Sequence, residues 1–404
     1  MSNKLPNDWL VLELKELIDK KRSIRYGIVQ PGEYDENGRY MVRGQDYSFG
    51  WVEPENLFKV SDVIENKYKN ARLKTGDIIL TIVGAGTGTV AIVPDWLDGA
   101  NCTQTTARIA IEPSKASSLF CYYYLSSDKG KKLTYQNIKG GAQPGLNCGD
   151  IENFEIILPP LPEQKAIARV LSTADAAIHT TEKLIAQKEL RKKWLMQQLL
   201  TGKKRLKGFG GEWMTFKMKE IGFIPEKNAI AKVDNQKLLT VKLHTKGIEF
   251  NERDKPIISG TGRPYYERNK GEILIGRQNI HNGGIGLVTD EFDGHICSNA
   301  ISSFVVNSTF SLKFILFYLQ YPNNYQRFED YMGGTGQKEI SEKQLLEIPI
   351  KLPESNEEQT AIAQVLQAAD KEITLLKAKA EKLRELKKGL MQQLLTGKIR
   401  LKIN

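Results

Sequence analysis

The chain has 404 residues, 40% of them hydrophobic and 26% charged, which is typical of a globular protein of roughly two to four domains. Its formal net charge of +10 favours a polyanionic partner, most simply nucleic acid, although charge alone does not establish one. No apolar run is long enough for a membrane span, and the first residues lack the apolar core of a secretory signal. The cysteines are scattered, which predicts reduced thiols in a cytoplasmic protein; they are Cys102, Cys121, Cys148 and Cys297.

Residues 1–158 are predicted to form the first of two mixed α/β domains. Short apolar runs separated by turn residues predict strands at 78–83, 89–93 and 107–111. The aromatic-rich stretch 119–125 predicts a helix whose rings pack into the core. The glycine-rich segment 84–88 is either a tight turn or a loop that lets the backbone approach DNA closely, and both interpretations remain open.

Residues 159–207 predict the first of two long helices. Pro159, Pro160 and Pro162 mark its start, and Gly202 suits a left-handed cap at its end. From Pro162 to Leu200 it has close to 40 residues and would extend about 55–60 Å. The spacing of its apolar residues is typical of a coiled-coil face. They are Ile167, Leu171, Ala174, Ile178, Ile185, Leu195 and Leu199, and Thr181, Lys188 and Lys192 interrupt them.

Residues 208–352 predict the second mixed α/β domain. Strands are expected at 273–275, 285–288 and 301–306, and an aromatic-rich helix at 314–321. A second glycine-rich turn, Gly283-Gly284-Ile285-Gly286, lies beside these strands. Neither glycine-rich segment has the full context of a phosphate-binding loop.

Residues 353–404 predict the second long helix, which follows Pro353 and ends at Gly397. Each helix needs a partner for its apolar face, and the simplest partner is the other helix, in an antiparallel pair with a pseudo-two-fold axis. A helical linker or a dimerisation coil is the alternative. The apolar positions are Ile362, Leu366, Ala369, Ile373, Leu376, Ala380, Leu383, Leu390 and Leu394, with Lys387 interrupting them.

An internal repeat is the strongest feature of the sequence. Leu-Met-Gln-Gln-Leu-Leu-Thr-Gly-Lys occurs at 195–203 and again at 390–398, 195 positions later. The same offset separates Glu163-Gln164 from Glu358-Gln359. It also separates Gly76-Asp77-Ile78 from the less similar segment Gly271-Glu272-Ile273. The helices are near-copies, whereas the domains have diverged. A duplicated scaffold of this kind predicts two similar tasks performed on two different targets.

Polar residues that suit base edges gather near the glycine-rich turns of both domains. Arginine and lysine suit guanine, and asparagine and glutamine suit adenine, although most such loop residues in proteins are simply solvated. The DNA-binding candidates of the first domain are Arg43, Gln45, Thr87, Gln104, Thr105, Thr106, Lys139 and Gln143. Those of the second domain are Lys242, His244, Arg277, Gln278, Asn279, His281, Asn282, Asn299, Gln337 and Lys338.

Motifs for catalysis and for cofactors are missing from the sequence. A Walker-type loop, a dinucleotide fingerprint and the Asn/Asp-Pro-Pro-Tyr/Phe motif of amino-methyltransferases do not occur. His295 and Cys297 are too few ligands to predict a zinc site. The sequence therefore predicts no cofactor, no metal and no catalytic residue. A standalone methyltransferase or nuclease, and a coiled-coil adaptor that does not read bases, remain alternatives.

The whole chain resembles the specificity subunits of type I restriction–modification systems. The resemblance rests on the segments 158–168 and 352–363, the two Met-Gln-Gln-Leu-Leu-Thr-Gly-Lys ends, and the Gly-Gly-x-Gln-like turns at 140–143 and 334–337. The segment Leu5-Pro6-Asn7-Asp8-Trp9, at the start of the first domain, is also similar to the start of this domain in the family. Trp213 resembles it less clearly at the start of the second domain.

The resemblance implies an α+β fold with two target-recognition domains, 1–158 and 208–352, and two helical spacers, 159–207 and 353–404. It implies that each domain reads one half of a split double-stranded DNA site. The helices would set the spacing between the half-sites and dock two methyltransferase subunits, through which restriction subunits join. Catalysis, cofactor binding and ATP use would then belong to those partners. The bases read differ among members of the family, so the resemblance assigns no base-reading residue.

Overall fold

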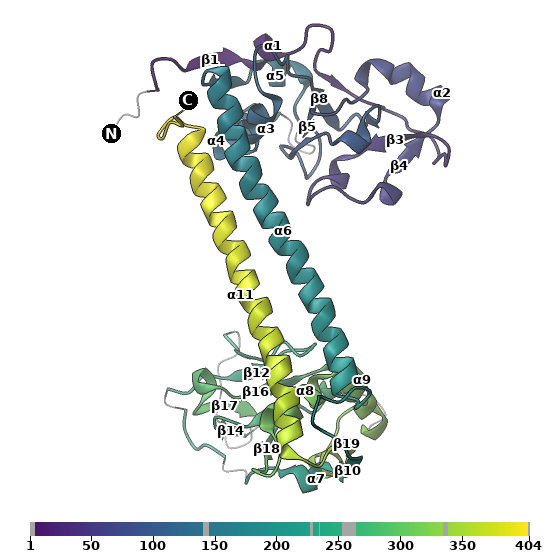
Figure 1. Cartoon of the computed structure of the whole chain (residues 1–404), viewed down its shortest axis with the longest axis vertical. Helices are drawn as coiled ribbons and strands as arrows, with labels where there is room; N and C mark the ends of the chain where they lie inside the picture. The colour runs from purple at the N-terminus through teal and green to yellow at the C-terminus, as the bar shows by residue number, and fades with distance from the viewer. Residues whose placement is uncertain are drawn as a thin grey trace. The chain divides into compact units, whose positions relative to one another are not determined.

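The computed structural model describes residues 5–139, 145–226, 229–233, 235–252, 264–333 and 338–402. Two compact units divide the chain. The first comprises Met1–Glu182 with Lys379–Asn404, and the second comprises Lys183–Ala378. The long helices α6 (Leu161–Leu199) and α11 (Asn356–Leu394) each supply residues to both units (Figure 1). Among the described residues, no helix is long and apolar enough to cross a membrane.

Short strands and helices make up the globular part of the first unit. The strands are β1 (Leu10–Glu13), β2 (Arg25–Tyr26), β3 (Arg39–Val42), β4 (Phe58–Val60), β5 (Ile78–Thr81), β6 (Val90–Ile92), β7 (Asn101–Cys102), β8 (Thr106–Ile109) and β9 (Glu155–Leu158). The helices are α1 (Leu14–Leu17), α2 (Asp62–Glu65), α3 (Ser118–Ser126), α4 (Asp128–Asn137) and α5 (Cys148–Glu152). The 3₁₀ turns are η1 (Gly44–Asp46), η2 (Pro54–Asn56), η3 (Asn66–Ala71) and η4 (Asp95–Leu97).

An antiparallel sheet in the order β2-β8-β5-β6 forms the centre of the first unit. Every residue of β5 is buried, and Ile78 lies opposite both Ile109 on β8 and Ile92 on β6. Branched apolar residues suit such a strand because they pack well on a pleated surface. The predicted strands at 78–83, 89–93 and 107–111 are confirmed. A further sheet, β4-β3-β7, was not predicted from the sequence.

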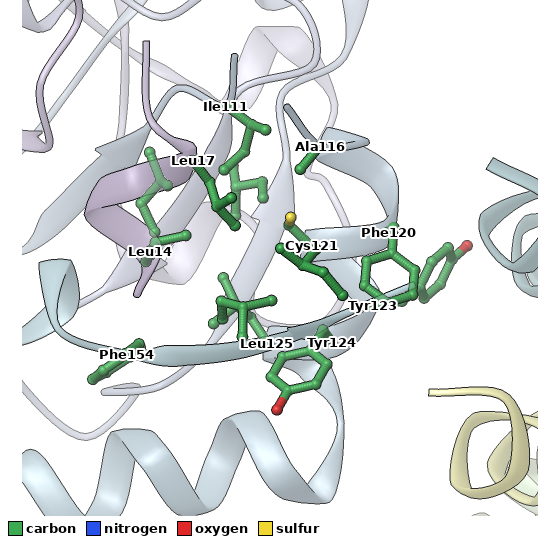
Figure 2. Close-up of a cluster of buried hydrophobic side chains, with 14 of the residues drawn as sticks. Leu14, Leu17, Ile111, Ala116, Phe120, Cys121, Tyr123, Tyr124, Leu125 and Phe154 are labelled. Carbon is green, nitrogen blue, oxygen red and sulfur yellow. The ribbon is translucent and has the colours of Figure 1, made fainter. Parts of the chain in front are cut away.

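The main core of the first unit joins α1, α3 and the start of α6. Leu14, Leu17, Phe120 and Cys121 are fully buried in it, and Figure 2 shows these side chains gathered around α3. The predicted aromatic helix at 119–125 is therefore confirmed. Burial raises the pKa of the Cys121 thiol to about 12, which keeps it protonated. All four cysteines lie in described residues and are free thiols, as predicted.

The second unit repeats this plan. Its strands are β10 (Trp213–Lys217), β11 (Gly222–Phe223), β12 (Leu239–Val241), β13 (Ile248–Phe250), β14 (Tyr265–Arg268), β15 (Ile273–Gly276), β16 (Ile285–Leu287), β17 (His295–Ser298), β18 (Ile301–Val306) and β19 (Pro349–Pro353). Its helices are α7 (Met218–Ile221), α8 (Leu312–Gln320), α9 (Pro322–Gln326) and α10 (Glu342–Glu347). Its 3₁₀ turns are η5 (Ile280–Asn282), η6 (Asp290–Phe292) and η7 (Arg327–Tyr331).

The central sheet of the second unit has the equivalent order, β11-β18-β15-β16. Its strands β15, β16 and β18 confirm those predicted at 273–275, 285–288 and 301–306, and α8 confirms the helix predicted at 314–321. In both units the first strand pairs with the strand that precedes the long helix, β1 with β9 and β10 with β19. The duplication seen in the sequence is thus a duplication of the fold.

A buried glutamine fixes the start of each long helix to its own globular domain. Gln164 accepts a hydrogen bond from the backbone amide of Ser117 at 2.9 Å and donates to the carbonyl of Pro159 at 2.8 Å. Gln359 does the same with Ser311 and Pro353, at the same two distances. Because Ser117 and Ser311 precede α3 and α8, one side chain joins two helices in each unit. This role explains why the glutamine recurs in the repeat.

Ion pairs show that α6 and α11 run antiparallel within each unit. In the first unit, Asp175 pairs with Lys387 at 2.5 Å, and the later residue Glu182 pairs with the earlier residue Arg384. Lys387 interrupts the predicted apolar pattern because it forms this cross-helix pair. The predicted antiparallel pairing is confirmed.

The same explanation holds for the interruptions in the second unit. Lys188 pairs with Glu372 and Lys192 pairs with Asp370, both at 2.5 Å. The third interruption in α6, Thr181, belongs to the first unit, where it is buried and donates its hydroxyl to the carbonyl of Ala177 at 2.8 Å. The apolar seam of the two helices is therefore broken by paired or satisfied polar groups.

A left-handed glycine follows each long helix, as predicted. Gly202 has a φ of +70° and Gly397 a φ of +71°. A Cβ added to Gly202 would lie 3.2 Å from the Trp213 ring, and one added to Gly397 would lie 2.8 Å from Pro6. Both positions therefore need glycine, for the backbone conformation and for the close contact.

The substitution Gly389→Ala is expected to stabilise the first unit by about 1 kcal/mol, because glycine inside a helix is less favourable than alanine. Gly389 lies within α11, and a Cβ at this position would meet no heavy atom within 4 Å. Urea unfolding of the full chain provides the measurement. Gly397→Ala is the matched control and should destabilise. Equal effects of the two substitutions would contradict the prediction.

Candidate functional site

Three chain segments meet at the same end of the central sheet in each unit, and we call this arrangement the three-segment site. In the first unit, the loop after β5 begins at Ile82, whose amide donates to Thr105 at 2.8 Å and whose carbonyl accepts from Leu146 at 2.8 Å. In the second unit, the amide of Arg277 donates to Ala300 at 3.1 Å, and its carbonyl accepts from Ile340 at 3.2 Å.

These contacts join equivalent residues in the two units. Ile82 and Thr105 lie 195 positions before Arg277 and Ala300, the offset of the sequence repeat. The third segment is also held alike, by a paired bridge between Lys139 and Gly145 in the first unit and between Gly333 and Glu339 in the second. Most of the DNA-binding candidates belong to these three segments, so the fold gathers residues that are far apart in sequence.

A groove of about 810 Å³ opens at the three-segment site of the first unit. Four of the predicted residues line it: Arg43, Gln45, Gln104 and Thr105. Gln45 and Gln104 are exposed, so their amides are available to a ligand. The unpredicted sheet β4-β3-β7 explains how Arg43 and Gln45 reach the groove, since both follow β3 directly.

A neutral hydroxyl network lies at the base of this groove. The hydroxyl of the buried Tyr47 lies 2.7 Å from that of Thr81 and 3.3 Å from that of Thr106. Burial raises the pKa of Tyr47 to about 12, so the phenol is uncharged near neutral pH. Thr106 is fully buried in this network, which corrects its prediction as a residue facing DNA. The position of Thr106 at the start of β8 makes it part of the sheet.

Thr87 and Lys139 do not line the groove, and the side chains of both have partners within the first unit. Thr87 donates its hydroxyl to the carbonyl of Gly84 at 2.6 Å and so stabilises the glycine-rich turn. Lys139 is largely exposed and pairs with Asp150 at 2.6 Å. Arg43 is held by the carboxylate of Asp46 at 3.0 Å. Gln143 lies outside the described residues.

In the second unit the predicted run from Arg277 to Asn282 forms one compact cluster. Arg277 pairs with Glu339 at 2.8 Å, Gln278 also contacts Glu339, and the side chains of His281 and Asn282 lie 3.0 Å apart. Asn279 is exposed. The buried Nε of Arg277 and the buried Nδ1 of His281 have no hydrogen-bond partner within the described part of the chain.

His244 belongs to the same cluster because its amide donates to the carbonyl of Asn282 at 2.8 Å. Its φ of +57° is unusual for a residue other than glycine. Asn299 is half-buried and precedes Ala300, so it occupies the position equivalent to Gln104. Lys242 pairs with Glu249 at 2.6 Å and Lys338 with Glu329 at 2.8 Å. Gln337 lies outside the described residues.

Phe49 also lines the groove, although it was not among the DNA-binding residues predicted from the sequence. Its relative exposure of 103% is the highest among the large apolar residues described. The turn that carries it is well anchored, because Ser48 donates its hydroxyl to the carbonyl of Gly44 at 2.7 Å. The aromatic run Tyr47-Ser48-Phe49-Gly50-Trp51 gave no means of distinguishing the exposed ring from the buried ones.

The substitution Tyr47→Phe is expected to reduce the loss of stability at high pH. The pKa of Tyr47 is about 12 in the folded chain, above its ordinary value of 10. This tyrosine therefore contributes fully below pH 10, and its contribution is lost as the pH rises through 12. Between pH 9 and pH 11 the variant should lose about 1 kcal/mol less than the parent in urea unfolding. The exposed Tyr135→Phe is the control, and an equal change in both variants would contradict the assignment.

The described residues contain no group of three or more His, Cys, Asp or Glu side chains arranged to hold a metal ion. His295 and Cys297, the two possible ligands noted in the sequence, have other partners. The Nδ1 atom of His295 accepts a hydrogen bond from the amide of Lys237 at 3.1 Å, and Cys297 is buried against Arg268 at 2.8 Å.

Comparison with known proteins identifies the family. A family model described as the type I restriction modification DNA specificity domain matches residues 6–189 and again residues 210–385. The chain therefore belongs to the family of type I restriction–modification specificity subunits. It is 30% identical to the sequence assigned as the MjaX type I restriction enzyme specificity subunit of Methanocaldococcus jannaschii, over 98% of this chain and 95% of that one.

Solved structures show the same fold. The type I restriction–modification S subunit of M. genitalium matches with a TM-score of 0.61 at 16% identity, covering 100% of this chain and 98% of that one. The HsdS subunit of Thermoanaerobacter tengcongensis matches with a TM-score of 0.54 at 19% identity, covering 98% and 99%.

Proposed function

We propose that each three-segment site reads one half of a bipartite double-stranded DNA site. The observation that carries this proposal is the contrast between the two units. The contacts that hold the three segments are equivalent, whereas the side chains presented differ, with Gln104 in one unit at the position of Asn299 in the other. A scaffold that is kept while its exposed residues change suits recognition of two different sequences.

The side chains at each site suit the major groove of DNA. The exposed amides of Gln45 and Gln104 match the paired donor and acceptor of adenine. Arg277 in the second unit, whose guanidinium pairs with Glu339 at 2.8 Å, is suited to guanine. The exposed ring of Phe49 is suited to contact a thymine methyl group. The net charge of +10 supports phosphate contacts that do not depend on sequence.

The long helices are proposed to set the spacing between the half-sites and to dock two methyltransferase subunits. Large apolar side chains remain exposed along them, at Leu190, Trp194, Leu375 and Leu386, and partner helices would cover these. Restriction subunits would join through the methyltransferases. The chain itself would be non-catalytic, with target-recognition domains at 1–158 and 208–352 and spacers at 159–207 and 353–404.

The proposed location is the cytoplasm. Three of the four free cysteines are buried as thiols, which suits a reducing compartment. Burial also raises the pKa of Cys102 to about 12, so this thiol is unreactive in the folded chain.

Methylome sequencing tests the proposed function. A host that expresses the chain together with its methyltransferase is compared with a host that lacks only the chain. We expect a split, asymmetric methylated motif that depends on the chain and reveals both half-sites. If no motif depends on the chain, the proposal fails, and the chain is an adaptor or an enzyme of its own.

A further inference from the structure

A strongly basic pocket lies in the first unit, at the start of α4 and the last turns of α11, and we call it the α4–α11 pocket. Its volume is about 660 Å³, which is within the range of small-molecule sites. It is lined by Ser126, Ser127, Asp128, Lys129, Lys131, Arg384, Lys387, Lys388, Met391, Gln392, Leu395, Thr396 and Lys398. The pocket does not overlap the groove of the three-segment site.

Most of the cations in this pocket have no counter-ion. Arg384 pairs with Glu182, and Lys387 pairs with Asp175. The other four lysines, Lys129, Lys131, Lys388 and Lys398, form no ion pair with any described residue, and Asp128 is the single acidic residue of the lining. Burial and the nearby charge of Lys398 lower the pKa of Lys129. These like charges repel one another until an anion binds among them.

The start of α4 adds backbone amide donors to the pocket, and its first turn carries Asp128. Ser127 caps this ten-residue helix and accepts a hydrogen bond from the amide of Gly130 at 3.4 Å. The first-turn amides of a helix and its dipole favour phosphate and other anions. The lysines and the helix terminus therefore act on the same volume of the pocket.

The second unit contains the equivalent hollow without the excess charge. It has a volume of about 570 Å³ and lies between the end of α6 and the α8–α9 corner. Met196 and Gln197 line it, 195 positions before Met391 and Gln392. Glu189 lies 195 positions before Arg384, and Asn323 is the second residue of α9 as Lys129 is of α4. Since the shared fold produces both hollows, the basic charge is specific to the first one.

We propose that the α4–α11 pocket binds phosphate groups, supplied either by a DNA backbone or by a free polyphosphate. Lysine ammonium groups beside helix amides are suited to several phosphate oxygens at once. Binding of a free polyphosphate in this pocket does not depend on base reading. Binding of a DNA backbone there rests on the proposed function.

Two double variants of the full chain provide a test with a matched control. Lys388→Gln with Lys398→Gln removes two charges from the pocket. Lys193→Gln with Lys203→Gln removes two charges at the equivalent positions of the second unit. Inorganic tripolyphosphate binding is measured by calorimetry, and duplex DNA binding is measured across a range of salt concentrations.

We expect the pocket variant to weaken tripolyphosphate binding about tenfold, or to reduce the slope of log K against log salt for DNA by about 2, while the control variant changes little. Weaker tripolyphosphate binding alone identifies a free polyphosphate as the ligand. A smaller salt dependence of DNA binding alone identifies the DNA backbone. Sequence preference should be unchanged in either case, which separates this result from a failure of base reading.

Equal behaviour of the pocket variant and the control in both measurements would overturn the proposal. So would a pocket variant that only loses association with the methyltransferase, because that result would indicate an acidic polypeptide as the occupant.

Discussion

The double substitution Gln45→Ala with Gln104→Ala is expected to lower discrimination at one half-site by about 100-fold and to leave the other half-site unchanged. Both side chains are exposed and line the groove of the first unit. A glutamine that bonds an adenine edge at two points contributes about 1–3 kcal/mol of discrimination, and separate base contacts add approximately. Methylation rates on duplexes that differ at one base pair, measured with the methyltransferase present, provide the test.

The second unit offers the matched variant. Asn279→Ala with Asn299→Ala should relax the other half-site in the same way, since Asn299 occupies the position of Gln104. Together the two variants assign each half-site to one unit. If both variants relaxed the same half-site, or if neither changed the methylated motif, the three-segment sites would not be the reading surfaces.

The long helices and the central strands were predictable from the sequence because their patterns are local. Ile362, Leu366 and Ile373 repeat at steps of four and seven residues, and all three are buried in α11. The run 78–83 is apolar except for Thr81, which fits the full burial of β5. Patterns of this kind are set by the period of the helix or by the burial of the strand, so they survive without knowledge of distant contacts.

The groove could not be predicted because distant segments form it. Arg43 and Gln45 reach it through the sheet β4-β3-β7, in which β3 pairs with β7 more than 50 residues later. The burial of Thr106 follows from its contact with Tyr47, and nothing in the local sequence separates it from its half-buried neighbour Thr105. The sequence placed the candidates near the turns, but which of them face a ligand depends on tertiary structure.

The substitution Glu358→Ala is expected to destabilise the second unit by about 3 kcal/mol, because it leaves a partly buried arginine without its carboxylate. Glu358 is fully buried at the start of α11, and it binds Arg205, which follows the end of α6. Among the residues that the structure describes, Arg205 would retain only the carbonyls of Gly210 and Gly211. The pair therefore ties the two helices together at the base of the second domain.

The equivalent pair in the first unit supplies an internal comparison. Arg400 binds Glu163 at 2.6 Å, but it also binds Asp8 at 2.7 Å, so Glu163→Ala leaves it a partner and should cost less stability. Hydrogen exchange at the first turns of α6 and α11, together with urea unfolding, would measure both effects. Glu381→Ala, which removes an exposed pair with Arg384, is the control. If Glu358→Ala were no more damaging than this control, the pair would not stabilise the unit, and its recurrence in both halves would then have to reflect a role in assembly with partner subunits.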